Sequence, residues 1–204
     1  MSAAYTSSPG LQDGIEARIL DAALIRFSEF GVKKTTIEDI ARQAGVDRVT
    51  IYRRVGSRDD VVQAVVSREV AAVLIEVDAI STRHSTLADL VADIFVTVVT
   101  RWRDHPLVKR MLTVEPERIL EKLTVEGGPV FAMSVAAAHT ALCRAADAGL
   151  FTEPADLLTR AEVACRLVHS FILCPSGLVP LESDEQLDEF ARAYVVPIVA
   201  SSGQ

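Results

Sequence analysis

Apolar residues recur every three or four positions along most of this chain, which is the spacing of one face of an α-helix. Ile19, Ala23, Phe27 and Phe30 follow this spacing, and a glycine such as Gly31 often ends a helix. The run 95–100 is rich in β-branched residues, but the segment lengths and the lack of hairpin turn pairs favour helix. We therefore predict an all-α fold of about nine helices. Further helices are predicted over residues 58–80, 87–102, 130–148, 157–173 and 187–199.

Residues 36–55 combine the features of a helix-turn-helix. Thr36 followed by Asp39 has the spacing of a capped helix start. Gly45 suits the tight turn that ends the first helix, and Asp47 is interpreted as the N-cap of a second helix over 48–55 rather than as a base reader. The second helix of such a pair can lie in the DNA major groove. The residues expected to face inward are Ile37, Ile40, Ala41 and Ala44 and, in part, Val49, Ile51 and Val55.

Composition narrows the class of protein. Half of the 204 residues are hydrophobic and 24% are charged, which is typical of a globular protein. The formal net charge of −7 excludes a uniformly basic coat for nucleic acid. Residues 15–58, however, carry nine Lys and Arg against six Asp and Glu. The local positive charge therefore falls on the helix-turn-helix segment.

The N-terminal segment and the cysteines indicate the compartment. Residues 1–14 are small and polar, with neither the basic nor the apolar region of a secretion signal, and we expect a flexible tail. No apolar run approaches the ~18 residues of a membrane span. Three cysteines without a CxxC pattern suggest reduced thiols. We expect a cytoplasmic protein that does not bind membranes.

The segment ILDAALIRFSEFGVKKTTIEDIARQAGVDRVTIYRRVGSRDDVV, residues 19–62, resembles the N-terminal domain of the TetR family of transcriptional regulators. The shared features are the two alanines and phenylalanine of the first helix, the Gly31 turn, the two threonines, IA-x-x-AGV and T-I-Y. Val55 stands where many members have Phe, and Arg58 where many have Lys. The resemblance implies a homodimeric repressor with a DNA-binding domain over 15–57 and a helical ligand-binding and dimerisation domain over 58–204.

Within the motif, we expect three kinds of DNA contact. Arg48 is the candidate for reading guanine O6 and N7, and Thr50 can meet a thymine or a phosphate. Tyr52 can place its hydroxyl on a phosphate, although packing of its ring is an alternative role, and exposed arginines are often only solvated. The predicted DNA-binding set is Thr36, Arg48, Val49, Thr50, Tyr52, Arg53, Arg54 and Arg58, with Lys33 and Lys34 as further phosphate candidates.

The C-terminal part is expected to form the dimer and to hold an effector. Residues 157–173 and 187–199 have wide apolar surfaces, and two such helices from each subunit would form a four-helix interface. Packing of these helices only within one monomer is an alternative. A two-fold dimer predicts a pseudo-palindromic operator with half-sites about one helical turn or somewhat more apart. A small, mostly apolar effector would release the DNA. The predicted lining residues are Phe95, Val99, Trp102, Met111, Phe131, His139, Arg166 and His169. Core packing is the alternative role of the apolar members.

Other chemistries have weaker support. His139 with Cys143 and Cys165 with His169 are both i,i+4 pairs, and facing pairs would make a zinc site, but buried cysteine and histidine are also ordinary core residues. We expect no metal and no cofactor. The sequence shows no Gly-rich phosphate loop, GxSxG or HExxH pattern, which argues against an enzyme. A helical carrier or scaffold that does not use DNA is a further alternative.

Overall fold

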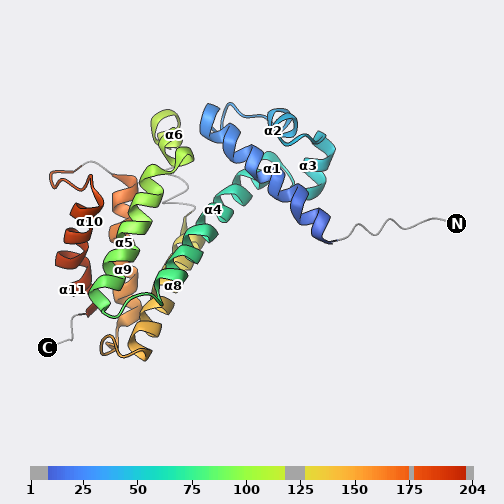
Figure 1. Cartoon of the computed structure of the whole chain (residues 1–204). Helices are drawn as coiled ribbons and strands as arrows, with labels where there is room; N and C mark the ends of the chain where they lie inside the picture. The colour runs from blue at the N-terminus through green and yellow to red at the C-terminus, as the bar shows by residue number, and fades with distance from the viewer. Residues whose placement is uncertain (1–8, 118–126, 175–176, 201–204) are drawn as a thin grey trace. The chain divides into compact units, whose positions relative to one another are not determined.

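The computed structural model describes residues 9–117, 127–174 and 177–200, and its regular elements over those ranges are all helical (Figure 1). The predicted all-α fold is confirmed. When the last three segments are counted as one continuous helix, the described ranges hold nine helices, as predicted. The elements are α1 (Pro9–Phe30), α2 (Ile37–Ala44), α3 (Arg48–Arg54), α4 (Arg58–Ile80), α5 (Leu87–Asp104), α6 (Pro106–Val114), α8 (Gly128–Asp147), α9 (Leu157–Leu173), α10 (Asp184–Phe190), the π-helical segment η1 (Ala191–Val195) and α11 (Val196–Ala200).

The helix α1 is longer than the sequence predicted. It begins at Pro9, inside the segment 1–14 that was expected to be a tail. Proline suits the first turn of a helix, because the N–H that it lacks would have no partner there. Residues 1–8 lie outside the described ranges.

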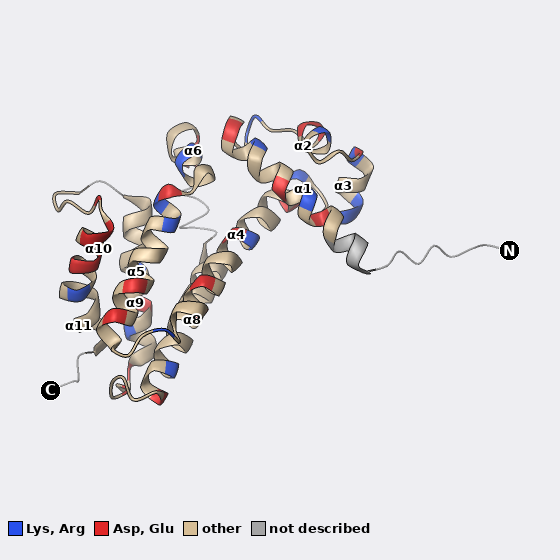
Figure 2. Cartoon of the chain, viewed as in Figure 1, with Lys and Arg blue, Asp and Glu red and all other residues tan. Residues whose placement is uncertain are grey.

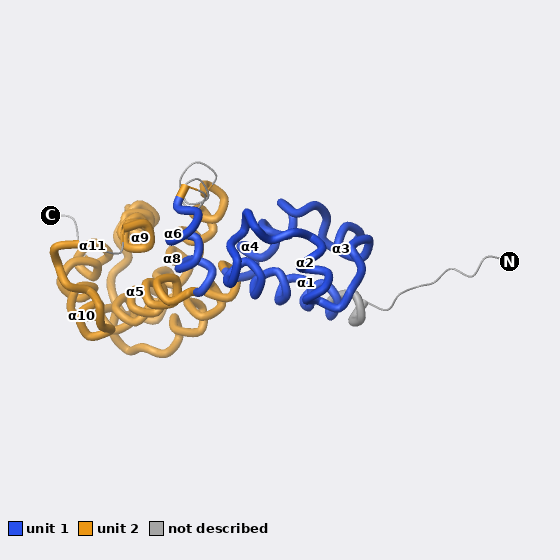
Figure 3. The backbone as a smooth tube through the Cα atoms, turned by 90° about the horizontal axis from the view of Figure 1, so that it is seen from above, with its two compact units in different colours: residues 1–69, 106–116 blue, residues 70–105, 117–204 orange. Residues whose placement is uncertain are grey.

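The chain forms two compact units, whose boundaries differ from those predicted (Figure 3). The first contains residues 1–69 together with 106–116, and the second contains residues 70–105 and 117–204. The compact units differ from the predicted domains, 15–57 and 58–204, in two respects. The division between the units falls inside α4, and α6 belongs to the first unit because it packs on α1.

The core of the first unit lies between α1, α2, α3, α6 and the beginning of α4. The predicted apolar face of α1 is confirmed for Ile19, Ala23 and Phe27, which are fully buried. Phe30 is instead 43% exposed, and the guanidinium of Arg26 lies 4.2 Å from the centre of its ring. Other buried members of this unit are Val32, Ile40, Ile51, Val61 and Val65.

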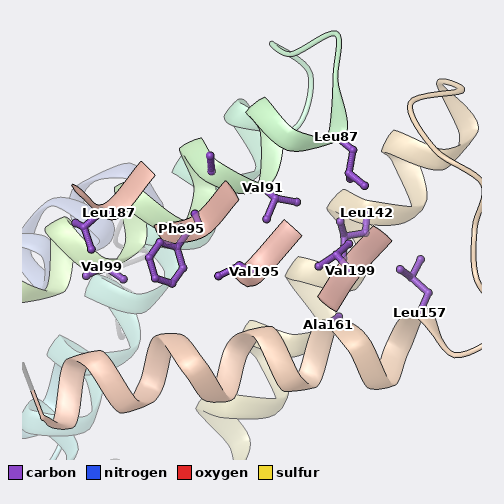
Figure 4. Close-up of a cluster of buried hydrophobic side chains, with 12 residues drawn as sticks. Leu87, Val91, Phe95, Val99, Leu142, Leu157, Ala161, Leu187, Val195 and Val199 are labelled. Carbon is purple, nitrogen blue, oxygen red and sulfur yellow. The ribbon is translucent and has the colours of Figure 1, made fainter. Parts of the chain in front are cut away.

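The core of the second unit joins α5 to α9 and to the last helix. Figure 4 shows the side chains of this cluster converging, with Phe95 of α5 among them. The ring of Phe95 contacts Phe171 of α9 at 5.7 Å and Phe190 of α10 at 5.9 Å between centres. The remaining buried members include Leu87, Val91, Val99, Leu142, Leu157, Ala161, Leu187, Ala191, Val195 and Val199.

This core includes part of the predicted dimer surface. In the apolar stripe of the last helix, Leu187, Ala191, Val195 and Val199 are buried against α5 and α9 of the same chain. The periodicity identified this apolar face correctly. Of the predicted stripe, Tyr194 remains 61% exposed.

Pro197 follows an irregular turn in the last helix. The π-helical segment ends at Val195, and the N–H of Val196 donates to the carbonyl of Ala191, five residues earlier. A proline cannot donate to the preceding turn, and its ring crowds the carbonyl four residues before it. The helix continues past Pro197 by widening one turn rather than by ending.

None of the helices in the described ranges is both long and apolar enough to span a membrane.

Candidate nucleic-acid interface

The helix-turn-helix forms as the sequence predicted. Thr36 and Asp39 make a reciprocal capping box at the start of α2, and Gly45 ends that helix with φ of 64° and ψ of 40°. Asp47 caps α3, where its carboxylate accepts a hydrogen bond of 2.6 Å from the N–H of Thr50. The turn thus places α3 directly after α2, with both helix starts capped.

The two caps change the acid–base behaviour of their carboxyl groups. Hydrogen bonds from Thr36 hold the pKa of Asp39 below its ordinary value, and those from Thr50 do the same to the pKa of Asp47. A lowered pKa means that the folded state prefers the ionised cap. Both carboxylates are therefore committed to the turn rather than to a ligand.

The outer side of α3 carries a continuous exposed surface. Only Ile51 of this helix is fully buried, and the side chain of Arg48 is 65% exposed. Tyr52 is 57% exposed, so a purely internal packing role for its ring is wrong, and Arg53 is also exposed. Val49 is 71% exposed, which corrects its expected inward position and agrees with its place in the predicted DNA-binding set. Arg54 is half-buried.

An acidic side chain that the sequence analysis did not select lies beside this surface. Glu38 in the first turn of α2 has its Oε2 atom 3.8 Å from Nη1 of Arg48. The side chains are 66% and 65% exposed, respectively. Figure 2 shows acidic and basic residues side by side on α2 and α3. The spacing of ten residues between them gives no periodic signal, so only the folded turn reveals the pair.

Arg58 does not take the position expected for a phosphate contact. Its Nε atom donates a hydrogen bond of 3.0 Å to the carbonyl of Thr35, and Nη2 donates to the carbonyl of Val32. Its side chain is 31% exposed and also lies near the carboxylate of Asp59. The guanidinium thus holds the segment between α1 and α2. Lys33 and Lys34 on the same segment are exposed.

Two further residues support the motif from outside it. Arg18 of α1 donates a hydrogen bond of 2.7 Å to the carbonyl of Ala44, one of the carbonyls left without a partner at the end of α2. Glu115, just after α6, is only 2% exposed, and its Oε1 atom accepts a hydrogen bond of 2.9 Å from the N–H of Lys33. No local pattern marks either residue, because their partners lie 26 and 82 residues away.

The geometry agrees with a sequence match to a known family. Residues 19–65 match the sequence profile described as "Bacterial regulatory proteins, tetR family". The helix-turn-helix segment of this chain is therefore similar to that of the family. The matched range covers most of α1, all of α2 and α3 and the beginning of α4. The tetR family consists of transcriptional regulators and not of enzymes, as the sequence predicted.

The curated relatives that this chain matches are described as regulators. An uncharacterized HTH-type transcriptional regulator of Mycobacterium bovis is 32% identical over 102 residues, which are 50% of this chain and 52% of the relative. One from Mycobacterium tuberculosis is 31% identical over 102 residues, with the same shares. The chain thus spans about half the length of the curated relatives it matches.

Solved structures of the tetR family share the fold over almost the whole chain. AlkX, a TetR family repressor from Dietzia sp. implicated in biodegradation of n-alkanes, has a TM-score of 0.66 and 20% identity, covering 94% of this chain and 95% of its own. SmeT, the repressor of the Stenotrophomonas maltophilia multidrug efflux pump SmeDEF, has a TM-score of 0.60 and 27% identity, covering 88% and 89%. The similarity to AlkX concerns the fold alone.

The predicted effector residues of this chain are divided between its two compact units. Phe95 and Val99 are buried in the core of the second unit, whereas Met111 is buried in the first unit. The ring of Trp102 contacts His105, with 5.6 Å between centres. Phe95, Val99 and Met111 thus take part in the packing of their own units.

Three of the remaining effector candidates do lie together. The ring of Phe131 on α8 is 5.1 Å from that of His169 on α9, and the guanidinium of Arg166 is 5.1 Å from the centre of the Phe131 ring. Burial, followed by the nearby charge of Arg166, lowers the pKa of His169. A neutral imidazole beside an aromatic ring is able to orient an apolar ligand.

A shallow groove between α4 and α8 involves none of the eight predicted lining residues. Its volume is about 220 Å³. Most of its lining is apolar, and the carboxylate of Asp78 in this lining pairs with Arg144. The residues that line it are Leu74, Val77, Asp78, Ala136, Ala137, Thr140 and Ala141.

The two histidine–cysteine pairs do not form a metal site. The Sγ atom of Cys143 lies 3.6 Å from Nε2 of His139, but the described residues contain no group of three or more potential ligands. Burial raises the pKa of Cys165 to about 11, which disfavours the thiolate that a metal requires. His169 instead contacts Phe131.

Proposed function

We propose that this protein is a transcriptional repressor that binds a pseudo-palindromic DNA operator as a homodimer and releases it when a small, mostly apolar effector binds. The observation that carries the proposal is the exposed cationic side of α3, with Arg48 and Arg53, on a helix whose start is capped by Asp47. A capped short helix with exposed arginines and valine suits the major groove, where arginine pairs with guanine and apolar groups meet the thymine methyl. Such a regulator acts in the cytoplasm, where bacterial DNA lies.

The experiment is selection of bound fragments from random double-stranded DNA by the purified full chain. We expect an enriched inverted repeat, with affinity that falls steeply as the salt concentration rises. Arg48→Ala should lose discrimination at one base pair of each half-site by about 1–3 kcal/mol. A carrier or scaffold would enrich no sequence, and that result would exclude the proposal.

For the homodimer we propose an interface that involves α8 together with α9, which is one of the two helices predicted to form it. Exposed apolar side chains remain on both, at Met133 on α8 and at Leu158 and Val163 on α9. Sedimentation of Leu158→Glu should show monomers where the wild type is dimeric. Ile75→Glu is the matched control because Ile75 is an exposed apolar residue on α4. Dimers that tolerate Leu158→Glu would place the interface elsewhere.

The effector is proposed to act by preferring a form of the dimer that does not fit the operator. A ligand shifts such an equilibrium only by its difference in affinity for the two forms. The Phe131, Arg166 and His169 cluster supports an aromatic or apolar ligand with one polar group. Titration of a panel of such compounds into the operator complex tests this, and compounds that bind the protein without lowering operator affinity would contradict it.

A further inference from the structure

The helix-turn-helix contains three carboxylates, and only two of them have a role in the turn. Asp39 accepts hydrogen bonds from the backbone N–H and hydroxyl of Thr36, and Asp47 accepts one from the N–H of Thr50. Glu38 takes part in neither cap. Its side chain is 66% exposed and its carboxylate is oriented toward Arg48 on the next helix.

An exposed carboxylate on a DNA-binding surface is unfavourable for DNA binding unless it has a second effect that favours binding or selectivity. It repels the phosphate backbone and reduces the affinity that arginines supply. Glu38 does lie in the first turn of α2, where a negative charge is favourable, but Asp39 occupies the same turn. The distinctive property of Glu38 is therefore its place beside Arg48.

The hydrogen-bonding groups of the guanidinium determine how a neighbouring carboxylate affects Arg48. Arginine has five N–H donors in one plane, and it binds a phosphate or the O6 and N7 atoms of guanine equally readily. In the pair, Nη1 of Arg48 faces Oε2 of Glu38 at 3.8 Å. The Nη2 and Nε donors remain for a base edge, while the carboxylate disfavours a phosphate at the same guanidinium.

We propose that Glu38 is a specificity-determining residue that directs Arg48 to a base edge and away from the phosphate backbone. This inference rests on the proposed operator binding through α3. Arg48 then contributes to sequence discrimination rather than to general affinity. Glu38 acts through Arg48 and is a positioning residue, so its loss should change selectivity more than the affinity for arbitrary DNA.

The test compares Glu38→Gln with the wild type on the operator selected from random DNA. Dissociation constants are measured for that operator, for each single base substitution in one half-site, and for unrelated DNA. Glu38→Gln removes the charge and keeps the shape. Glu16→Gln is the matched control, since it removes one exposed negative charge from α1 of the same unit. Circular dichroism and thermal unfolding verify that each variant is folded.

We expect Glu38→Gln to bind unrelated DNA at least as tightly as the wild type and to lose about tenfold discrimination, at the same base pair that Arg48→Ala affects. The double variant should lose no more discrimination there than Arg48→Ala alone. Glu16→Gln should keep the wild-type ratios.

Two results would overturn the inference. One is unchanged discrimination by Glu38→Gln at the Arg48 base pair. The other is a loss at a different base pair, additive with Arg48→Ala, which would mean that Glu38 reads a base by itself. Failure of the wild type to select any sequence would instead refute the proposed operator binding.

Discussion

Gly31 lies so close to the buried carboxylate of Glu115 that a methyl group added at this position would collide with it. It ends α1 with φ of 86°, and a Cβ atom added there would lie 2.5 Å from Oε1 of Glu115. The carboxylate has no easy way to withdraw, because Glu115 is 2% exposed and the same oxygen accepts the hydrogen bond from Lys33. Gly31→Ala therefore adds a collision to the backbone strain.

The two contributions are separable in magnitude. A left-handed conformation costs an L-residue about 1–2 kcal/mol. Displacing the Glu115 carboxylate breaks its hydrogen bond and leaves buried polar groups unpaired, which costs about 1–3 kcal/mol more. Gly31→Ala should lower the free energy of unfolding of the first unit by about 2–5 kcal/mol in total.

Gly149 provides the control for strain alone. Its φ is 77°, and an added Cβ atom would have nothing within 4 Å. Gly149→Ala should cost only about 1–2 kcal/mol. In a Glu115→Ala background the collision is absent, so Gly31→Ala should there cost about as little as Gly149→Ala.

The assay is urea unfolding at one fixed protein concentration, since dimerisation contributes to apparent stability. Hydrogen exchange of α1 and α6 assigns the loss to the first unit. Equal costs of Gly31→Ala in the wild-type and Glu115→Ala backgrounds would refute the collision and leave backbone strain as the whole effect.

Three further predictions follow from single contacts. Arg58→Gln should lower thermal stability by removing the hydrogen bond to the carbonyl of Thr35, while the salt dependence of DNA binding stays unchanged. If the slope of log affinity against log salt concentration were reduced by about one, Arg58 would contact a phosphate instead. Because burial lowers the pKa of His169, the stability that this residue contributes is present above its ordinary pKa of 6.5 and is lost as the pH falls. Urea unfolding of His169→Gln should therefore show a smaller loss of stability below pH 6.5 than the wild type shows. Identical pH profiles of the two proteins would contradict this. Asp47→Ala should weaken binding to all DNA sequences, because the start of α3 frays without its cap. Asp47→Asn keeps an acceptor for the N–H of Thr50 and should bind DNA more tightly than Asp47→Ala. Equal affinities of the two variants would exclude a capping role.

The local features of the DNA-binding segment could be predicted from the sequence because they depend on neighbouring residues. The caps at Thr36 and Asp47 and the left-handed Gly45 involve spacings of two to four residues, which a linear pattern displays directly. The apolar face of α1 was likewise evident up to Phe27. Phe30 follows the same spacing but lies near the end of the helix, where the core no longer covers it.

Several features that the sequence did not predict depend on distant partners. Periodicity could not show that α6 packs on α1, or that the last helix is covered by α5 and α9. Arg58 was assigned to phosphate because its charge was known, whereas its carbonyl partners, 23 and 26 residues away, were not. The buried Glu115 resembles any other acidic residue in the sequence.

The chain crosses between its two units three times, near residues 69, 105 and 116, so the DNA-binding half is not one uninterrupted stretch of the gene. A chimera made by a single junction after residue 57 would take α1 from one parent and α6 from the other. Its success would then depend on whether the α6 parent supplies a carboxylate that fits the glycine turn. If residues 106–116 are transplanted together with residues 1–69, both the glycine turn and the carboxylate that it contacts come from the same parent.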